Sequence, residues 1–153
     1  MAKAIPEGHP SVRPYLHVDS AAEAIAFYEK AFGARELLRL EVPGGKIAHA
    51  EVEIADSLVM LCDPLPQFVS KPPPVLGGTS AEVLMYVDDV DAVVQRALDA
   101  GATVTAEVAD QLWGDRSGTI TDPFGQVWLI STHIEDLTPE EIAERARAAM
   151  TSS

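Results

Sequence analysis

Short stretches of the chain alternate apolar and polar residues, and between them apolar residues recur with helical spacing. Residues 12–18 alternate and predict a strand, while 21–32 present an apolar stripe that ends at Gly33 and predict an amphipathic helix. Ser20 and Glu23 have the spacing of a capping box at the start of this helix. Two-residue alternation then returns over 37–42, 47–55 and 57–62, which predicts three further strands.

The second half of the chain repeats this order. A strand over 81–87 precedes a helix that ends at Gly101, and Val87-Asp88 stands where the first half has Val18-Asp19. Alternating segments follow at 103–108, 118–121 and 126–131. The sequence therefore predicts an internal repeat, in which each half is one β-α-β-β-β unit.

The two units occupy residues 11–64 and 79–134. Between them, residues 65–78 contain Pro72-Pro73-Pro74 and Gly77-Gly78, a composition that predicts a linker. A C-terminal helix is expected over 138–150, with Thr138 and Glu141 forming a capping box. Its thin apolar stripe suits packing on its own domain or on a second subunit. We expect residues 1–153 to form a single domain.

Composition excludes several classes of function. Eleven Lys and Arg residues against twenty-four Asp and Glu residues give a net charge of −13, which disfavours binding to nucleic acid or to anionic membranes. No apolar run is long enough for a signal peptide or a membrane span, so we expect a soluble cytoplasmic protein. The single cysteine, Cys62, follows three apolar residues and is expected to be a buried small hydrophobe.

Alternation also predicts which side chains share a face of each sheet. Around His49, apolar residues at 48, 50, 52 and 54 oppose His49, Glu51 and Glu53. Each sheet must bury its apolar face beneath its helix. The opposite face then carries Arg13, Tyr15, His17, His49, Glu51, Glu82 and Tyr86. If the two sheets curve around a common space, these side chains line a ligand-binding cleft.

His49 and Glu51 are the candidate catalytic residues. They lie two residues apart on one predicted strand, and a carboxylate beside an imidazole can tune it for acid–base catalysis near neutral pH. With His17 they could also form a His/His/Glu metal site. Alternatively, His49 and Glu51 pair with each other or with Arg13 in a solvated cleft.

A polar loop over 113–118 is a further candidate for ligand contact. Trp113 offers a large apolar surface, and Arg116 could hold a carboxylate or phosphate. The alternative for Arg116 is an ion pair with Asp115 or Asp122 that fixes the loop. The segment 122–125, Asp-Pro-Phe-Gly, has the composition of a turn and is expected to be structural.

These features together resemble a known superfamily. The duplicated β-α-β-β-β order and the segments "GKIAHAEVEIADSLVML", "YVDDVDAV", "WGDRSGTITDPFG" and "THIEDLTPEEI" resemble the vicinal-oxygen-chelate superfamily, and within it the PhnB-like branch. The superfamily includes glyoxalases, bleomycin-resistance proteins and extradiol dioxygenases. The resemblance implies an α+β fold, in which two βαβββ modules form an open U-shaped barrel. It also implies a homodimer with small-molecule chemistry in the cleft.

The resemblance also locates the metal positions of the metal-dependent members. They fall on Arg13, Glu82 and Leu129, with one more near Met60, Leu61 or Cys62. A guanidinium and a leucine cannot ligate a divalent ion, so the usual metal site is not expected.

The expected function is therefore binding of a small organic or antibiotic-like molecule without a metal cofactor. The alternative is a lyase, isomerase or dioxygenase-type enzyme that uses His17, His49 and Glu51, with a displaced divalent metal or without one. A third reading is a regulatory or assembly module whose cleft is vestigial.

Overall fold

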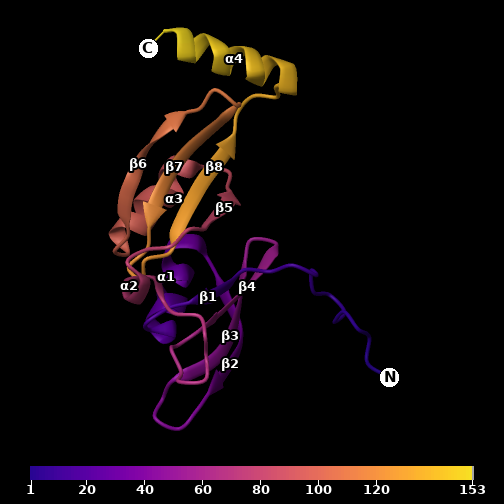
Figure 1. Ribbon diagram of the computed structural model, residues 1–153, viewed down its shortest axis with the longest axis vertical. Coiled ribbons are helices and arrows are strands. Elements are labelled where there is room, and N and C mark those ends of the chain that lie inside the picture. The colour runs from indigo at the N-terminus through magenta and orange to yellow at the C-terminus, as the bar shows by residue number, and fades with distance from the viewer. Residues whose placement is uncertain (153) are drawn as a thin grey trace.

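The computed structural model describes residues 1–152 and contains two modules of the same design (Figure 1). The first consists of β1 (Tyr15–His17), α1 (Ala21–Phe32), β2 (Arg35–Glu41), β3 (Ile47–Ile54) and β4 (Ser57–Cys62). After α2 (Pro73–Leu76), the second consists of β5 (Glu82–Tyr86), α3 (Val90–Asp99), β6 (Thr103–Asp110), β7 (Asp115–Thr121) and β8 (Val127–His133). The chain continues into α4 (Pro139–Thr151). The predicted repeat is confirmed.

Each module forms one four-stranded sheet, with strand orders β1-β4-β3-β2 and β5-β8-β7-β6. The first strand of each module runs parallel to the last, and the other pairs are antiparallel. Leu16 lies opposite Leu61 in the first module, and Met85 lies opposite Ile130 in the second. The two sheets do not close into a barrel, so the predicted open α+β architecture is confirmed.

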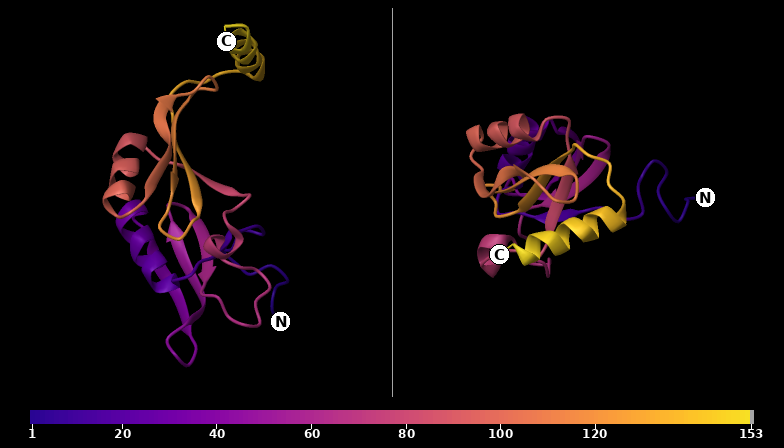
Figure 2. Two further views of the ribbon diagram at one scale, coloured as in Figure 1. Left: turned by 60° about the vertical axis from the view of Figure 1, so that its left-hand side comes forward. Right: turned by 90° about the horizontal axis from the view of Figure 1, so that it is seen from above.

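Helices α1 and α3 lie on the same side of the molecule and pack against each other (Figure 2). Apolar residues of both modules form one continuous core, in which Ile25, Tyr28 and Trp128 are fully buried. Burial of this apolar surface is the main stabilising term of such a fold. The opposite faces of the sheets are left for other contacts.

Polar bonds also join the modules. The Tyr28 hydroxyl of α1 donates to Asp122 Oδ2 at 2.7 Å, and Trp128 Nε1 donates to the same oxygen at 3.0 Å. Asp122 Oδ1 accepts the backbone N–H groups of Phe124 and Gln126. The turn at 122–125 is therefore structural, as predicted, and its carboxylate contacts both modules.

Two expectations for the first module are wrong in detail. The predicted strand over 12–18 is reduced to β1, because Pro14 has no N–H to donate and Val12 is exposed. Ser20 makes no side-chain cap at the start of α1. Instead Asp63, from the end of β4, accepts the Ala21 N–H at 2.7 Å.

The linker contains one turn of helix, α2, which its composition did not predict. Prolines are tolerated in the first turn of a helix, and Gly77 ends this one in the left-handed region. The C-terminal helix has the predicted capping box between Thr138 and Glu141, but no side chain within α4 is buried. It projects from the end of the second sheet (Figure 1). No helix among residues 1–152 is long and apolar enough to cross a membrane.

Candidate functional site

The first sheet brings together the polar side chains that alternation placed on one face. Leu16, Ala50 and Leu61 pair across β1, β3 and β4 and belong to the core beneath α1. The residues that alternate with them point to the opposite side. This face carries Tyr15, His17, His49, Glu51 and Cys62, which we call the first-module site.

A hydrogen-bonded chain of three side chains runs through this site. Tyr15 Oη lies 2.8 Å from His49 Nδ1, and His49 Nε2 lies 3.1 Å from Glu51 Oε1. Both ring nitrogens of His49 are therefore engaged. A histidine held between a carboxylate and a phenol has its ring orientation fixed, which suits it to bind a polar group or to relay a proton.

Cys62 is a buried residue that also contacts the polar side chains of this site. The side chain is buried, as predicted, but its Sγ lies 3.4 Å from His17 Nδ1. The His17 ring in turn stacks on Tyr15, with centroids 5.4 Å apart. The contact between Cys62 and His17 follows from strand register, because the two residues lie directly opposite each other across β1 and β4. Register is the signal that could have found it in the sequence.

The linker covers one side of the site. Phe68 meets the His17 ring edge-on, with centroids 6.2 Å apart. A cavity of about 320 Å³ lies beside them, lined by Tyr15, His17 and residues 67–70. Aromatic walls around a small cavity beside polar side chains are typical of ligand sites. The linker was not predicted to contribute.

Partial burial shifts the pKa values of three groups of this site, each toward the uncharged form. It raises the pKa of the Tyr15 hydroxyl, and the neighbouring Cys62 and Glu51 raise it further. Burial also lowers the pKa of His17 and raises the pKa of the Cys62 thiol. Tyr15 is therefore a phenol, His17 a neutral imidazole and Cys62 a thiol at neutral pH.

The side chains do not fit the metal site of the superfamily. Arg13, at one implied position, points its guanidinium to His9 of the N-terminal arm, and Leu129 offers no donor atom. Among residues 1–152, no group of three or more His, Cys, Asp or Glu side chains is arranged to hold a metal ion. A metal on His49 would have to displace Tyr15 or Glu51 from the ring.

A second polar cluster forms on the other module, around the buried Asp115. Its Oδ2 accepts from Tyr86 Oη at 2.9 Å and from Trp113 Nε1 at 3.1 Å, while Oδ1 lies 2.8 Å from His133 Nδ1. Burial alone would raise the pKa of Asp115, but these three donors outweigh it and hold the pKa below its ordinary value. Sequence patterns indicated Tyr86 and Trp113 but missed Asp115 and His133.

The two modules carry different chemistry at matching positions. Tyr86 pairs with Ser131 across β5 and β8, where the first module pairs His17 with Cys62. Ser117 of β7 lies opposite Ser131, and the two hydroxyls are 2.8 Å apart. The imidazole and thiol of the first module are thus replaced by hydroxyl groups in the second.

Arg116 forms ion pairs with partners other than those expected. Strand β7 already begins at Asp115, so Arg116 lies in a strand and not in a loop. Its guanidinium makes a bidentate contact with Asp91 of α3, at 2.7 and 3.0 Å, and a further bond with Asp110 at 2.9 Å. The predicted partners Asp115 and Asp122 are wrong. Two carboxylates therefore neutralise Arg116.

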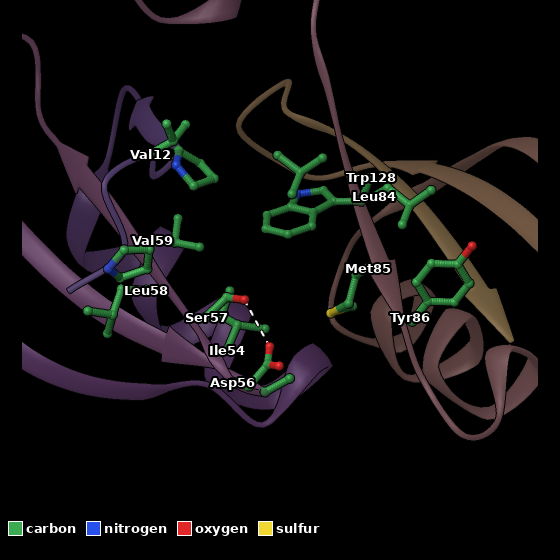
Figure 3. Close-up of a pocket in the computed structure, with 14 residues that line it drawn as sticks. Val12, Ile54, Asp56, Ser57, Leu58, Val59, Leu84, Met85, Tyr86 and Trp128 are labelled. Atoms are coloured by element: carbon green, nitrogen blue, oxygen red, sulfur yellow. Dashed lines mark hydrogen bonds between the residues drawn. The ribbon is translucent and has the colours of Figure 1, made fainter. Parts of the chain in front are cut away.

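A larger cavity, of about 710 Å³, lies where the two modules meet (Figure 3). The β3–β4 hairpin, residues 54–59, lines one side, and β5 residues 83–86 together with Trp128 line the other. Its walls are mostly apolar side chains. Of the predicted ligand-binding residues only Tyr86 lines it, while Glu82 lies outside it on the exposed end of β5.

Duplicated βαβββ modules with polar sheet faces define a class of protein, and comparison with known families identifies it. Residues 10–130 match the glyoxalase/bleomycin resistance protein/dioxygenase superfamily, and the chain belongs to it. The predicted superfamily is confirmed.

Individual relatives are similar over most of the chain. An uncharacterized protein of Mycobacterium bovis, Mb0911c, is 47% identical over 146 residues, which are 94% of this chain and 93% of the relative. The solved structure of the Arabidopsis thaliana At5g48480 product has 31% identity and a TM-score of 0.64, covering 80% of this chain and 98% of that one. A PhnB protein from Bacillus cereus, 16% identical, shares the fold, with a TM-score of 0.62 over 80% of this chain and 99% of its own.

Proposed function

We propose that the protein binds a small organic molecule at the first-module site, without a metal ion. One observation carries this proposal: the Tyr15–His49–Glu51 hydrogen-bonded chain stands beside a cavity walled by the rings of Tyr15, His17 and Phe68. Rings supply apolar contact area, and a few fixed polar groups set the orientation of a ligand.

The chemistry of the site indicates the kind of molecule. With Tyr15, His17 and Cys62 uncharged, the polar atoms of the site are suited to hydrogen bonds with a neutral ligand. The aromatic walls favour a flat ring system. We therefore propose a planar, antibiotic-like compound with a polar edge directed at His49 and Glu51.

Proton transfer by His49 is the second candidate function, of the lyase or isomerase type. The observation that favours it is the same chain, in which Glu51 orients the imidazole and Tyr15 can pass its proton. Because the pKa of Tyr15 is raised, its hydroxyl stays protonated at neutral pH, so Tyr15 would be a proton donor and not the base. Turnover of a bound ligand that is lost in His49→Gln would favour this candidate over binding alone.

We further propose that the protein is a homodimer. The edge strand β2 has three exposed leucines, Leu37, Leu38 and Leu40, and no side chain of α4 is buried against the rest of the chain. Sedimentation at micromolar concentration tests this proposal, since a monomer would contradict it.

A thermal-shift screen of planar organic compounds tests the binding proposal. A hit should raise the melting temperature of the native protein. The shift should be lost in His49→Ala and Glu51→Ala, both of which should remain folded because neither side chain belongs to the core. Glu53→Ala is the matched control: it alters the same strand, but Glu53 pairs with Arg35 outside the site. Equal shifts in all three variants would contradict the proposal, and so would unfolding of both site variants.

Metal content is tested separately. Protein purified without a metal-affinity tag is analysed for metals and then titrated with Zn²⁺, Mn²⁺, Fe²⁺ and Ni²⁺. We expect no stoichiometric metal and no shift in melting temperature. A bound metal that is lost in His49→Ala would replace the metal-free proposal with the displaced metal site.

A further inference from the structure

The second module has a cavity of its own, apart from the first-module site. It measures about 410 Å³ and lies at the carboxyl ends of the neighbouring parallel strands β5 and β8. Tyr86, Val87 and Asp88 line it from one strand, and Thr132 and His133 from the other. Nothing in the binding function proposed above uses it.

One buried carboxylate holds two aromatic rings: Tyr86, which lines this cavity, and Trp113, which lies beside Tyr86 without lining the cavity. Asp115, only 3% exposed, accepts the Tyr86 hydroxyl and the Trp113 indole N–H on the same oxygen. The rings themselves remain 54% and 40% exposed. Their polar ends are thus already used, so what each ring offers to a ligand is its π surface. Large aromatic rings that are both exposed and held in one orientation usually contact a ligand or another molecule.

Carboxylates outnumber cationic side chains around these rings, although Arg96 lines an adjoining cavity with Tyr86 and Asp88. Asp88 and Asp89 follow β5, Asp115 accepts the polar ends of both rings, and Asp136 follows β8, where it accepts a bond from His133. His133 is the one titratable cation that lines the cavity. The arginine of β7, Arg116, is neutralised by two carboxylates, as described above.

Negative potential and exposed π faces select the same kind of ligand. The face of an aromatic ring attracts cations. An ammonium group that lies over such a face is bound more tightly when a carboxylate is also close by. We propose that Tyr86, Trp113 and Asp88 form a binding site for an organic cation, a quaternary or protonated ammonium group, at the carboxyl ends of β5 and β8. This site is independent of the ligand proposed for the first module.

The two tryptophans make the proposal measurable by NMR. Each gives one indole N–H signal: Trp113 lies at the proposed site, and Trp128 is buried and bonded to Asp122, which makes it an internal control. The protein is titrated with choline and, at matched ionic strength, with 3,3-dimethyl-1-butanol, which has the same shape without the charge. Choline should shift the Trp113 signal saturably, with an affinity at least about threefold that of the neutral alcohol. The Trp128 signal should not move.

Substitutions show which residues the choline-induced shift of the Trp113 signal depends on. Tyr86→Leu should abolish it, whereas Tyr86→Phe should retain most of it because the π face remains. Asp88→Asn should weaken choline binding without affecting the alcohol. His49→Ala should leave choline binding unchanged, which separates this proposal from the first-module site. Equal responses to choline and the alcohol, an unmoved Trp113 signal, or full binding in Tyr86→Leu would overturn the proposal.

Discussion

Tyr28 donates its hydroxyl hydrogen to Asp122 Oδ2 across a distance of 2.7 Å, and this bond ties the first helix of one module to the last turn of the other. Both side chains are buried. Since Asp122 also accepts from Trp128 and from two backbone N–H groups, its carboxylate is fully engaged. The contact between the modules therefore depends on polar geometry as well as on apolar burial.

Removal of this hydroxyl should weaken the whole fold. Tyr28→Phe keeps the ring but takes one donor from Asp122, so we expect a loss of about 1–2 kcal/mol in the free energy of unfolding. Denaturant titration measures it, and a single transition with unchanged slope is expected if both modules unfold together. Tyr15→Phe, which removes an exposed hydroxyl bond, should cost less. Equal losses in the two variants would contradict the special role of Tyr28.

Ile25 tests the apolar packing of α1. Its side chain is almost completely buried between α1 and the core. Ile25→Ala should lower the free energy of unfolding by about 2–5 kcal/mol, because it removes buried contacts and leaves a cavity. Ile5→Ala in the exposed N-terminal arm is the control and should have no measurable effect. A negligible change at Ile25 would mean that α1 packs on another face.

Gly114 holds the start of β7 against the segment that leads to α4. Its φ of +96° lies in the left-handed region, and a Cβ atom there would overlap the carbonyl oxygen of Glu135. Gly114→Ala should lower stability by about 1–3 kcal/mol and shift the neighbouring Trp113 indole signal. Gly44 is the control, because it also has a positive φ, +98°, but open space around it. Gly44→Ala should therefore lower stability only through the unfavourable backbone conformation. Similar losses in the two variants would exclude a steric effect at Gly114.

His133 should make stability depend on pH. Hydrogen bonds from its ring to Asp115 and then to Asp136 raise its pKa above the ordinary value of 6.5. The charged ring therefore stabilises the fold fully at pH values below 6.5, and this contribution is lost as the pH rises through the raised pKa. NMR titration should place His133 above the ordinary value and His17, whose pKa burial lowers, below it.

Asp136→Asn should lower the pKa of His133, since it removes one of the two carboxylates. The pKa of His17, which lies on the other module, should not change. An unchanged His133 titration would show that the contact with Asp136 contributes nothing in solution.

Local sequence patterns predicted the parts of the structure that depend on periodicity. Alternation placed Tyr15, His49 and Glu51 on one face, and the repeat predicted two equivalent sheets. Contacts that depend on how distant segments meet were missed. Phe68, in the linker, contacts His17 only because the folded chain brings the linker back to the first sheet. Arg116 bonds to Asp91 and Asp110, 25 and 6 residues away, and no rule of sequence spacing predicts these pairs.

The replacement of His17 and Cys62 in one module by Tyr86 and Ser131 in the other has an evolutionary consequence. After a gene segment is duplicated, identical copies are redundant, and either can change while the other retains the original role. Here the bonds that hold the halves together lie on the helix side or use a backbone atom, as where Gln126 Nε2 donates to the His17 carbonyl oxygen at 3.0 Å, so the side chains of each sheet face can differ without loss of these bonds. The single polypeptide thus carries two dissimilar surfaces at matching positions of its two modules.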